Sequence, residues 1–118
     1  MTSVAVLGST GSIGVQTLEV IDAAAEEFEV VALGAHASVE ALAAQAQRYR
    51  PAVVGLADDT RAKELRSLLP AGTELEAGPG ALASLSGLGD VAVNGVVGFA
   101  GLPVTIGALE SGRRLALA

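Results

Sequence analysis

Three glycines that follow the first apolar run constrain the fold of this chain more than any other feature. Val4–Leu7 is a run of four apolar residues, and Gly8, Gly11 and Gly14 come directly after it at intervals of three. Apolar residues then recur at the spacing of a helix. Glycine accepts backbone conformations and close contacts that a Cβ forbids. The pattern therefore predicts a strand, a tight turn and a helix that packs closely on the strand.

Short apolar runs alternate with helical stretches along the rest of the chain, which is typical of βαβ units and a parallel sheet. The expected strands are residues 4–7, 29–33, 52–56, 73–76, 90–94 and 114–117. The expected helices are residues 13–25, 38–48, 58–69, 79–85 and 103–111. Gly34 is expected to end the second strand, and Pro51 the second helix. The sequence predicts an α/β fold of the Rossmann type, a doubly wound and mostly parallel sheet with helices on both faces.

The composition supports a buried sheet and argues against several classes of partner. Hydrophobic residues make up 51% of the 118 residues, which is enough for one domain with a core. No apolar stretch approaches the roughly 18–20 residues of a membrane span, so we expect no membrane partner. A formal net charge of −6 with few clustered basic residues argues against a nucleic-acid partner. The chain has no cysteine, which excludes disulfides and thiolate metal ligands and fits a cytoplasmic protein.

The glycine turn has the features of a dinucleotide-binding loop. The N–H groups of Gly11, Ser12 and Ile13 are expected to point at a pyrophosphate from the start of the helix, with hydroxyl donors from Thr10 and Ser12. Gly11 would let the backbone approach the phosphates without a Cβ in the way. The alternative is a tight turn that needs glycine for its own geometry. A P-loop is disfavoured because its lysine is missing.

The turn after the second strand bears on the choice between NAD and NADP. An NAD site usually places an acidic residue at this point to bind the ribose 2′-hydroxyl. Here Leu33 is followed by Gly-Ala-His-Ala-Ser, and the first acid is Glu40. The missing carboxylate permits the 2′-phosphate of NADP, but no Arg or Lys lies nearby in the sequence. His36 and Ser38 are the expected donors, and an ordinary loop histidine is the alternative for His36.

Sequence agreement with one enzyme family extends along the whole chain in order. The stretches that carry it are Leu7–Gly14, Gln16–Leu18, Val30–Leu33, Val93–Leu102, Ala108–Gly112 and Leu115–Ala118. Together they resemble the 1-deoxy-D-xylulose 5-phosphate reductoisomerase family. The resemblance implies cofactor contacts at Thr10, Gly11, Ser12 and Ile13, and at His36, Ala37 and Ser38. At the latter turn the family often has Gly-Lys-Asn or Gly-Gly-Asn.

By this resemblance, the enzyme isomerises and reduces 1-deoxy-D-xylulose 5-phosphate to 2-C-methyl-D-erythritol 4-phosphate with NADPH, in non-mevalonate isoprenoid biosynthesis. A divalent metal (Mg, Mn or Co), a sugar-phosphate substrate and a homodimer are implied in the same way. The alternatives are the Rossmann domain of another NADP-linked enzyme, such as a semialdehyde or homoserine dehydrogenase, and a stand-alone dinucleotide-binding module.

The resemblance covers the nucleotide-binding part of the family. Residues 1–118 are expected to form the NADPH-binding domain, without the catalytic and C-terminal domains and without turnover of its own. The family continues after Leu-Ala-Leu-Ala with Asn-Lys-Glu-Ser, acidic metal ligands and the substrate-phosphate site. Catalytic residues are therefore expected beyond Ala118, and no metal ligand is predicted in this chain. Asp58 or Asp59 is expected to cap a helix.

Overall fold

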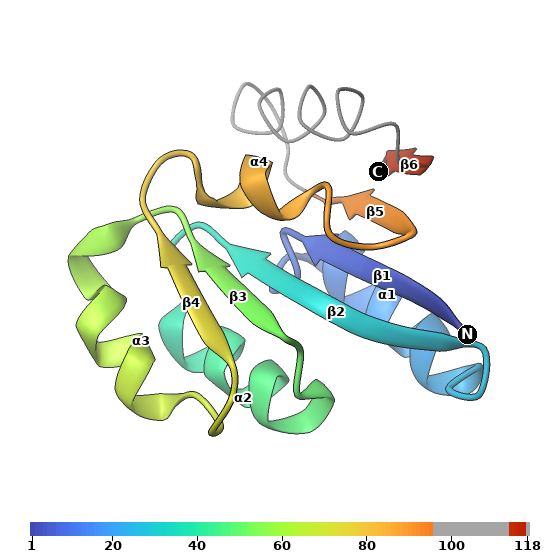
Figure 1. Cartoon of the computed structure of the whole chain (residues 1–118), viewed down its shortest axis with the longest axis horizontal. Coiled ribbons are helices and arrows are strands. Elements are labelled where there is room, and N and C mark those ends of the chain that lie inside the picture. The colour runs from blue at the N-terminus through green and yellow to red at the C-terminus, as the bar shows by residue number, and fades with distance from the viewer. Residues whose placement is uncertain (96–113, 118) are drawn as a thin grey trace.

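The computed structural model describes residues 1–95 and 114–117, which form a parallel sheet covered by helices (Figure 1). Its strands are β1 (Thr2–Leu7), β2 (Phe28–Ala35), β3 (Val53–Leu56), β4 (Glu74–Ala77), β5 (Val91–Asn94) and β6 (Arg114–Leu117). Its helices are α1 (Ser12–Ala23), α2 (Val39–Tyr49), the 3₁₀ turn η1 (Asp59–Arg61), α3 (Ala62–Leu68) and α4 (Ala81–Leu85). The strand order is β4-β3-β2-β1-β5-β6, and all neighbours are parallel. The predicted α/β fold with a doubly wound parallel sheet is confirmed.

The inner strands of the sheet are buried on both faces, and each face packs against its own helices. Val4 and Val6 of β1 belong to the apolar cluster that α1, α2 and α3 cover. Ala5 and Leu7 alternate with them and belong to a second cluster with α4, which lies on the opposite side of the sheet (Figure 1). This two-sided burial explains why the strands are continuous apolar runs in the sequence. No helix in the described part of the chain is long and apolar enough to cross a bilayer.

The expectation that Gly34 ends the second strand is wrong. β2 continues through Gly34 to Ala35, and Gly34 pairs with Leu7 of β1 and Gly55 of β3. A Cβ on Gly34 would lie 2.4 Å from Cδ2 of Leu82, which packs on the sheet from α4. Because Gly34 has no side chain, α4 can pack closely on the sheet at this position, and the glycine does not form a turn. The helix expected at residues 103–111 lies outside the described residues.

The strand order places a switch point at the carboxyl end of β1. From β1 the chain proceeds outward through β2, β3 and β4, and then returns to place β5 on the other side of β1. Doubly wound sheets bind ligands where the strand order reverses in this way. Gly95, just after β5, donates its N–H to the carbonyl oxygen of Leu7 at 2.7 Å. The glycine turn therefore begins at the switch point of the sheet.

Candidate dinucleotide-binding site

The glycine turn leaves β1 through a left-handed residue and is held against β2. Gly8 has a φ of 85°, a conformation that residues with a side chain rarely adopt. The N–H groups of Gly8 and Ser9 both donate to the carbonyl oxygen of Gly34, each at 2.8 Å. The N–H of Gly11 donates to the carbonyl oxygen of Gly8 at 3.2 Å and closes the turn. The N–H of Gly11 is thus bonded within the turn, and its contact with a phosphate stays a prediction.

The second and third glycines of the turn are needed for different reasons. A Cβ on Gly14 would lie 2.2 Å from the carbonyl oxygen of Gly8 and 2.5 Å from Cα of Ser9, and both atoms are backbone. A Cβ on Gly11 would meet only the oxygen of Gly8, at an ordinary 3.5 Å. Gly11 is exposed and has a φ of −80°, which any residue adopts. Packing within the described chain therefore requires glycine at position 14 but not at position 11.

The first turn of α1 is open to an anion. The N-cap residue is Gly11, and no side chain caps the helix. The first N–H groups of an α-helix have no partners within the helix and carry its positive dipole end. Ser12 and Ile13 are exposed, and Thr10 is half-buried beside them. The four predicted contact residues on this turn thus surround an uncapped helix start, where a phosphate can bind.

The second predicted contact region lies at the same edge of the sheet. His36, Ala37 and Ser38 connect β2 to α2, directly after the strand whose Gly34 carbonyl anchors the glycine turn. His36 and Ser38 are exposed, and Ala37 is half-buried. Ser38 is the N-cap residue of α2, but its side chain makes no capping hydrogen bond. The fold therefore brings the two predicted regions to neighbouring strand ends.

Gln45 is a residue of the site that the sequence did not single out. Its Nε2 donates to the carbonyl oxygen of Ser9 at 2.8 Å and ties α2 to the glycine turn. Ser9 is fully buried, and its hydroxyl donates to Gly34 at 3.3 Å. The Oε1 of Gln45 is buried and has no partner within the described chain. The sequence could have indicated this role of Gln45, because Gln45 is a polar residue that lies between the buried positions Leu42 and Ala46 of the helix.

An arginine also lies beside the second turn, although the sequence places no cation there. Arg61 in η1 makes an ion pair with Glu40 in the first turn of α2, with Nη2 at 2.7 Å from Oε1. The same nitrogen pairs with Glu64. The N–H of Asp58 donates to the carbonyl oxygen of His36 at 2.7 Å, so the segment after β3 is bonded to the turn after β2. No Arg or Lys lies near this turn in the sequence, but the fold brings Arg61 to Glu40 in the first turn of α2.

Neighbouring hydrogen-bond donors lower the pKa of two acids beside this turn, Glu40 and Asp58. The hydrogen bond from Arg61 lowers the pKa of Glu40, and their opposite charges add to the effect. The hydroxyl and the N–H of Thr60 donate to Asp58 and lower its pKa, with smaller contributions from the charges of His36 and Arg61. Asp58 caps η1 in this way, as expected from the sequence. The second turn is thus bordered by two carboxylates and one guanidinium.

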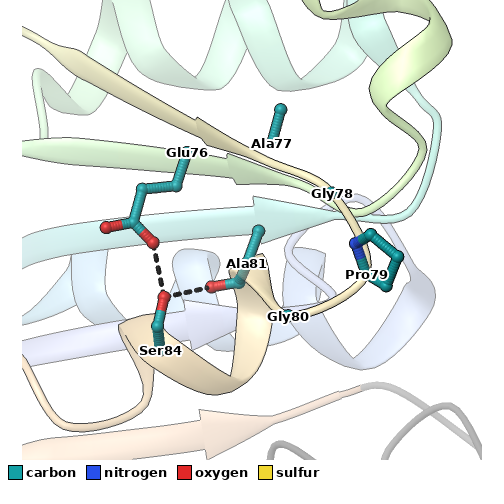
Figure 2. Close-up of a pocket in the computed structure, with 7 residues that line it drawn as sticks. All are labelled: Glu76, Ala77, Gly78, Pro79, Gly80, Ala81 and Ser84. Atoms are coloured by element: carbon teal, nitrogen blue, oxygen red, sulfur yellow. Dashed lines mark hydrogen bonds between the residues drawn. The ribbon is translucent and has the colours of Figure 1, made fainter.

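A separate hollow lies where β4 meets α4 (Figure 2). Its lining consists of Glu76, Ala77, Gly78, Pro79, Gly80, Ala81 and Ser84. The hydroxyl of Ser84 donates to the carboxylate of Glu76 and, at 3.1 Å, to the carbonyl oxygen of Ala81. β2 and β3 separate β4 from β1 in the sheet, and none of the residues that line this hollow belongs to the glycine turn. Its polar side chains bond to one another, which is consistent with a structural turn.

A divalent metal does not fit the described residues. Residues 1–95 and 114–117 contain no group of three or more His, Cys, Asp or Glu side chains that could hold a metal ion. Metals of the Mg type need several oxygen ligands in one place.

Comparison with known proteins connects these features to one family. The family model of 1-deoxy-D-xylulose 5-phosphate reductoisomerase matches residues 4–118. The relative of that name from Crocosphaera subtropica is 40% identical over the whole of this chain and 31% of its own length. The relative from Desulfosudis oleivorans is 43% identical over the whole of this chain and 32% of its own length.

Solved structures agree with the sequence comparison. The reductoisomerase from Zymomonas mobilis in complex with NADPH matches 99% of this chain and 31% of its own, with a TM-score of 0.93 and 34% identity. A DOX-P reductoisomerase in complex with NADPH, fosmidomycin and magnesium matches 98% of this chain and 29% of its own, with a TM-score of 0.89 and 30% identity. The chain thus spans just under a third of the relatives that it matches.

Proposed function

Since the chain belongs to the 1-deoxy-D-xylulose 5-phosphate reductoisomerase family, we propose that residues 1–118 form the NADPH-binding domain of such an enzyme. The observation that carries the proposal is the difference between Gly11 and Gly14. Packing inside the chain accounts for Gly14, whereas the open space at Gly11 is what a bound pyrophosphate needs. The match over residues 4–118 sets aside the semialdehyde and homoserine dehydrogenases as alternatives.

In this proposal the first turn binds the pyrophosphate. The N–H groups of Ser12 and Ile13 donate to it from the start of α1, and the hydroxyls of Thr10 and Ser12 add donors. Gly11 contributes by the absence of a side chain, because its own N–H is bonded to Gly8. Gln45 fixes the carbonyl of Ser9 and so holds the turn in the conformation that binds. NADPH, when bound, supplies the hydride for the reduction.

The second turn binds the adenosine ribose and its 2′-phosphate. His36, Ala37 and Ser38 lie where a doubly wound sheet places the ribose contact, and none of them carries the carboxylate of a typical NAD site. The hydroxyl of Ser38 makes no capping bond and is available to the phosphate. These contacts favour NADPH over NADH.

The remaining parts of the reaction are proposed for regions outside residues 1–118. The relatives are about three times as long as this chain, which leaves room for the divalent metal ligands and the sugar-phosphate site. The whole enzyme would convert 1-deoxy-D-xylulose 5-phosphate to 2-C-methyl-D-erythritol 4-phosphate. We extend the proposal to a homodimer, which the family resemblance supports. We also propose a cytoplasmic location, which the absence of cysteine fits.

Cofactor titration and turnover together test the proposed function. The protein is titrated with NADPH and with NADH, and the nicotinamide absorbance is followed after addition of the pentulose phosphate and Mg²⁺. Saturable binding with a preference for NADPH is expected of the 118-residue chain, and turnover only of the whole enzyme. The absence of binding of either cofactor would refute the assignment of a dinucleotide site.

A further inference from the structure

We propose that Arg61 is the cation that allows the turn after β2 to accept the 2′-phosphate of NADPH. This inference rests on the proposed function and deepens it. A permanent positive charge is absent from all three residues of this turn, His36, Ala37 and Ser38. These residues alone therefore do not explain how a dianionic phosphate is held. Arg61 comes from the next βα connection and lies beside the start of α2 through its ion pair with Glu40.

The need for a cation follows from the acids that border this turn. Glu40 lies in the first turn of α2, and Asp58 is bonded through its backbone to His36. Both carboxylates have lowered pKa values, chiefly through the hydrogen bonds from Arg61 to Glu40 and from Thr60 to Asp58. Two negative charges beside a 2′-phosphate repel it unless a cation offsets them. Without Arg61 this turn would therefore disfavour NADPH.

The backbone around Arg61 is held firmly against the turn. The N–H of Asp58 bonds to the carbonyl oxygen of His36, and the carboxylate of Asp58 accepts from the N–H and the hydroxyl of Thr60. Arg61 follows immediately as the last residue of η1. Parallel pairing of β2 with β3 brings both connections to the same end of the sheet (Figure 1). The position of Arg61 is thus set by structure that does not depend on its side chain.

The guanidinium of Arg61 retains donors for a ligand. Its ion pairs with Glu40 and Glu64 both use Nη2, and no bond from Nε or Nη1 is found within the described residues. The planar guanidinium has five N–H donors and binds phosphate in a bidentate manner. Its side chain is 39% exposed and that of Glu40 is 75% exposed. Exposed ion pairs contribute little, so the guanidinium can turn to a phosphate at small cost.

A pair of arginine variants on the same segment tests this role. Arg61→Gln and Arg66→Gln remove the same charge from the same type of side chain, and Arg66 lies further along the chain, in the last turn of α3. The dissociation constants of NADPH and NADH are measured for both variants and for the parent protein. Arg61→Gln is expected to weaken NADPH by about tenfold or more, the effect of one lost charge-assisted hydrogen bond, and NADH by less than about twofold. Arg66→Gln is expected to change neither.

A second variant tests the same role from the other side of the ion pair. Glu40→Gln removes a carboxylate that repels the phosphate and leaves Arg61 paired with Glu64 alone, so NADPH is expected to bind more tightly while NADH is unchanged. An unchanged ratio of the two affinities in both Arg61→Gln and Glu40→Gln would overturn the role of Arg61 and leave the dinucleotide site intact. If the parent protein binds neither cofactor, the proposed function fails together with this inference. A circular-dichroism spectrum of each variant establishes that it is folded.

Discussion

Substitutions at Gly14 and Gly11 are expected to distinguish a glycine that the fold requires from a glycine that cofactor binding requires. The new Cβ at position 14 would lie 2.2 Å from the carbonyl oxygen of Gly8 and 2.5 Å from Cα of Ser9. Neither atom can move alone, because the N–H groups of Gly8 and Ser9 are anchored on Gly34. Relief requires α1 to move away from the turn by about 1 Å, which weakens its packing on β1 and β5.

The magnitude of the Gly14 effect follows from this overlap. Forcing one extra carbon into a well-packed site typically costs about 1–3 kcal/mol and occasionally more. The overlap here is with backbone, and Leu18 and Ile21 depend on the same seating of α1 for their burial. We therefore expect Gly14→Ala to lower the free energy of unfolding by about 3 kcal/mol or more, a large part of the roughly 5–15 kcal/mol of a typical domain.

The Gly11 variants are the matched controls. Gly11→Ala places its Cβ in open space, so its free energy of unfolding should stay within about 1 kcal/mol of the parent value, the usual cost of an altered N-cap. Gly11→Val also suits the extended backbone of Gly11, but its branched side chain occupies the space proposed for the pyrophosphate. NADPH and NADH should both bind much more weakly to it.

Urea denaturation followed by circular dichroism measures the stabilities, and fluorescence titration measures the cofactor affinities. Two results would refute the reasoning. One is a Gly14→Ala protein as stable as the parent, which would mean that helix and turn do not meet as described. The other is a folded Gly11→Val protein with unchanged affinity for NADPH, which would place the cofactor elsewhere.

Three further substitutions test other contacts of the two turns. Ala37→Asp is expected to narrow the preference for NADPH over NADH, because a carboxylate there repels the 2′-phosphate; an unchanged ratio of dissociation constants would contradict it. Gln45→Ala is expected to weaken both cofactors by releasing the Ser9 carbonyl. Gln47→Ala, which removes a similar bond to the Leu68 carbonyl, should weaken neither, and equal losses would disprove the role of Gln45. The stability that Asp58 contributes is present above the usual aspartate pKa and is lost as the pH falls through its lowered value. The free energy of unfolding of Asp58→Asn should therefore fall less steeply at acid pH than that of the parent protein. The same dependence on pH in both proteins would argue against this contribution of Asp58.

The sequence by itself determined the elements and the first turn of the site. Strands buried on both faces are continuous apolar runs, and helices show their own spacing, so both signals lie within a few neighbouring residues. Gly8 and Gly14 were predicted because a tight turn between a strand and a helix imposes their conformation and their close contact locally. The agreement with the reductoisomerase family was likewise visible in contiguous stretches.

The tertiary structure alone decided which distant residues meet. Gly34 was predicted to end its strand because a glycine often marks a turn, but it accommodates Leu82 from α4, far along the chain. Gln45 reaches Ser9, and Arg61 reaches Glu40, across 36 and 21 positions of sequence. These contacts depend on the order of the strands and on which helix lies against which face, and neither is encoded in a local period. The chemistry at the second turn is therefore a property of two neighbouring βα connections, which only the folded sheet brings together.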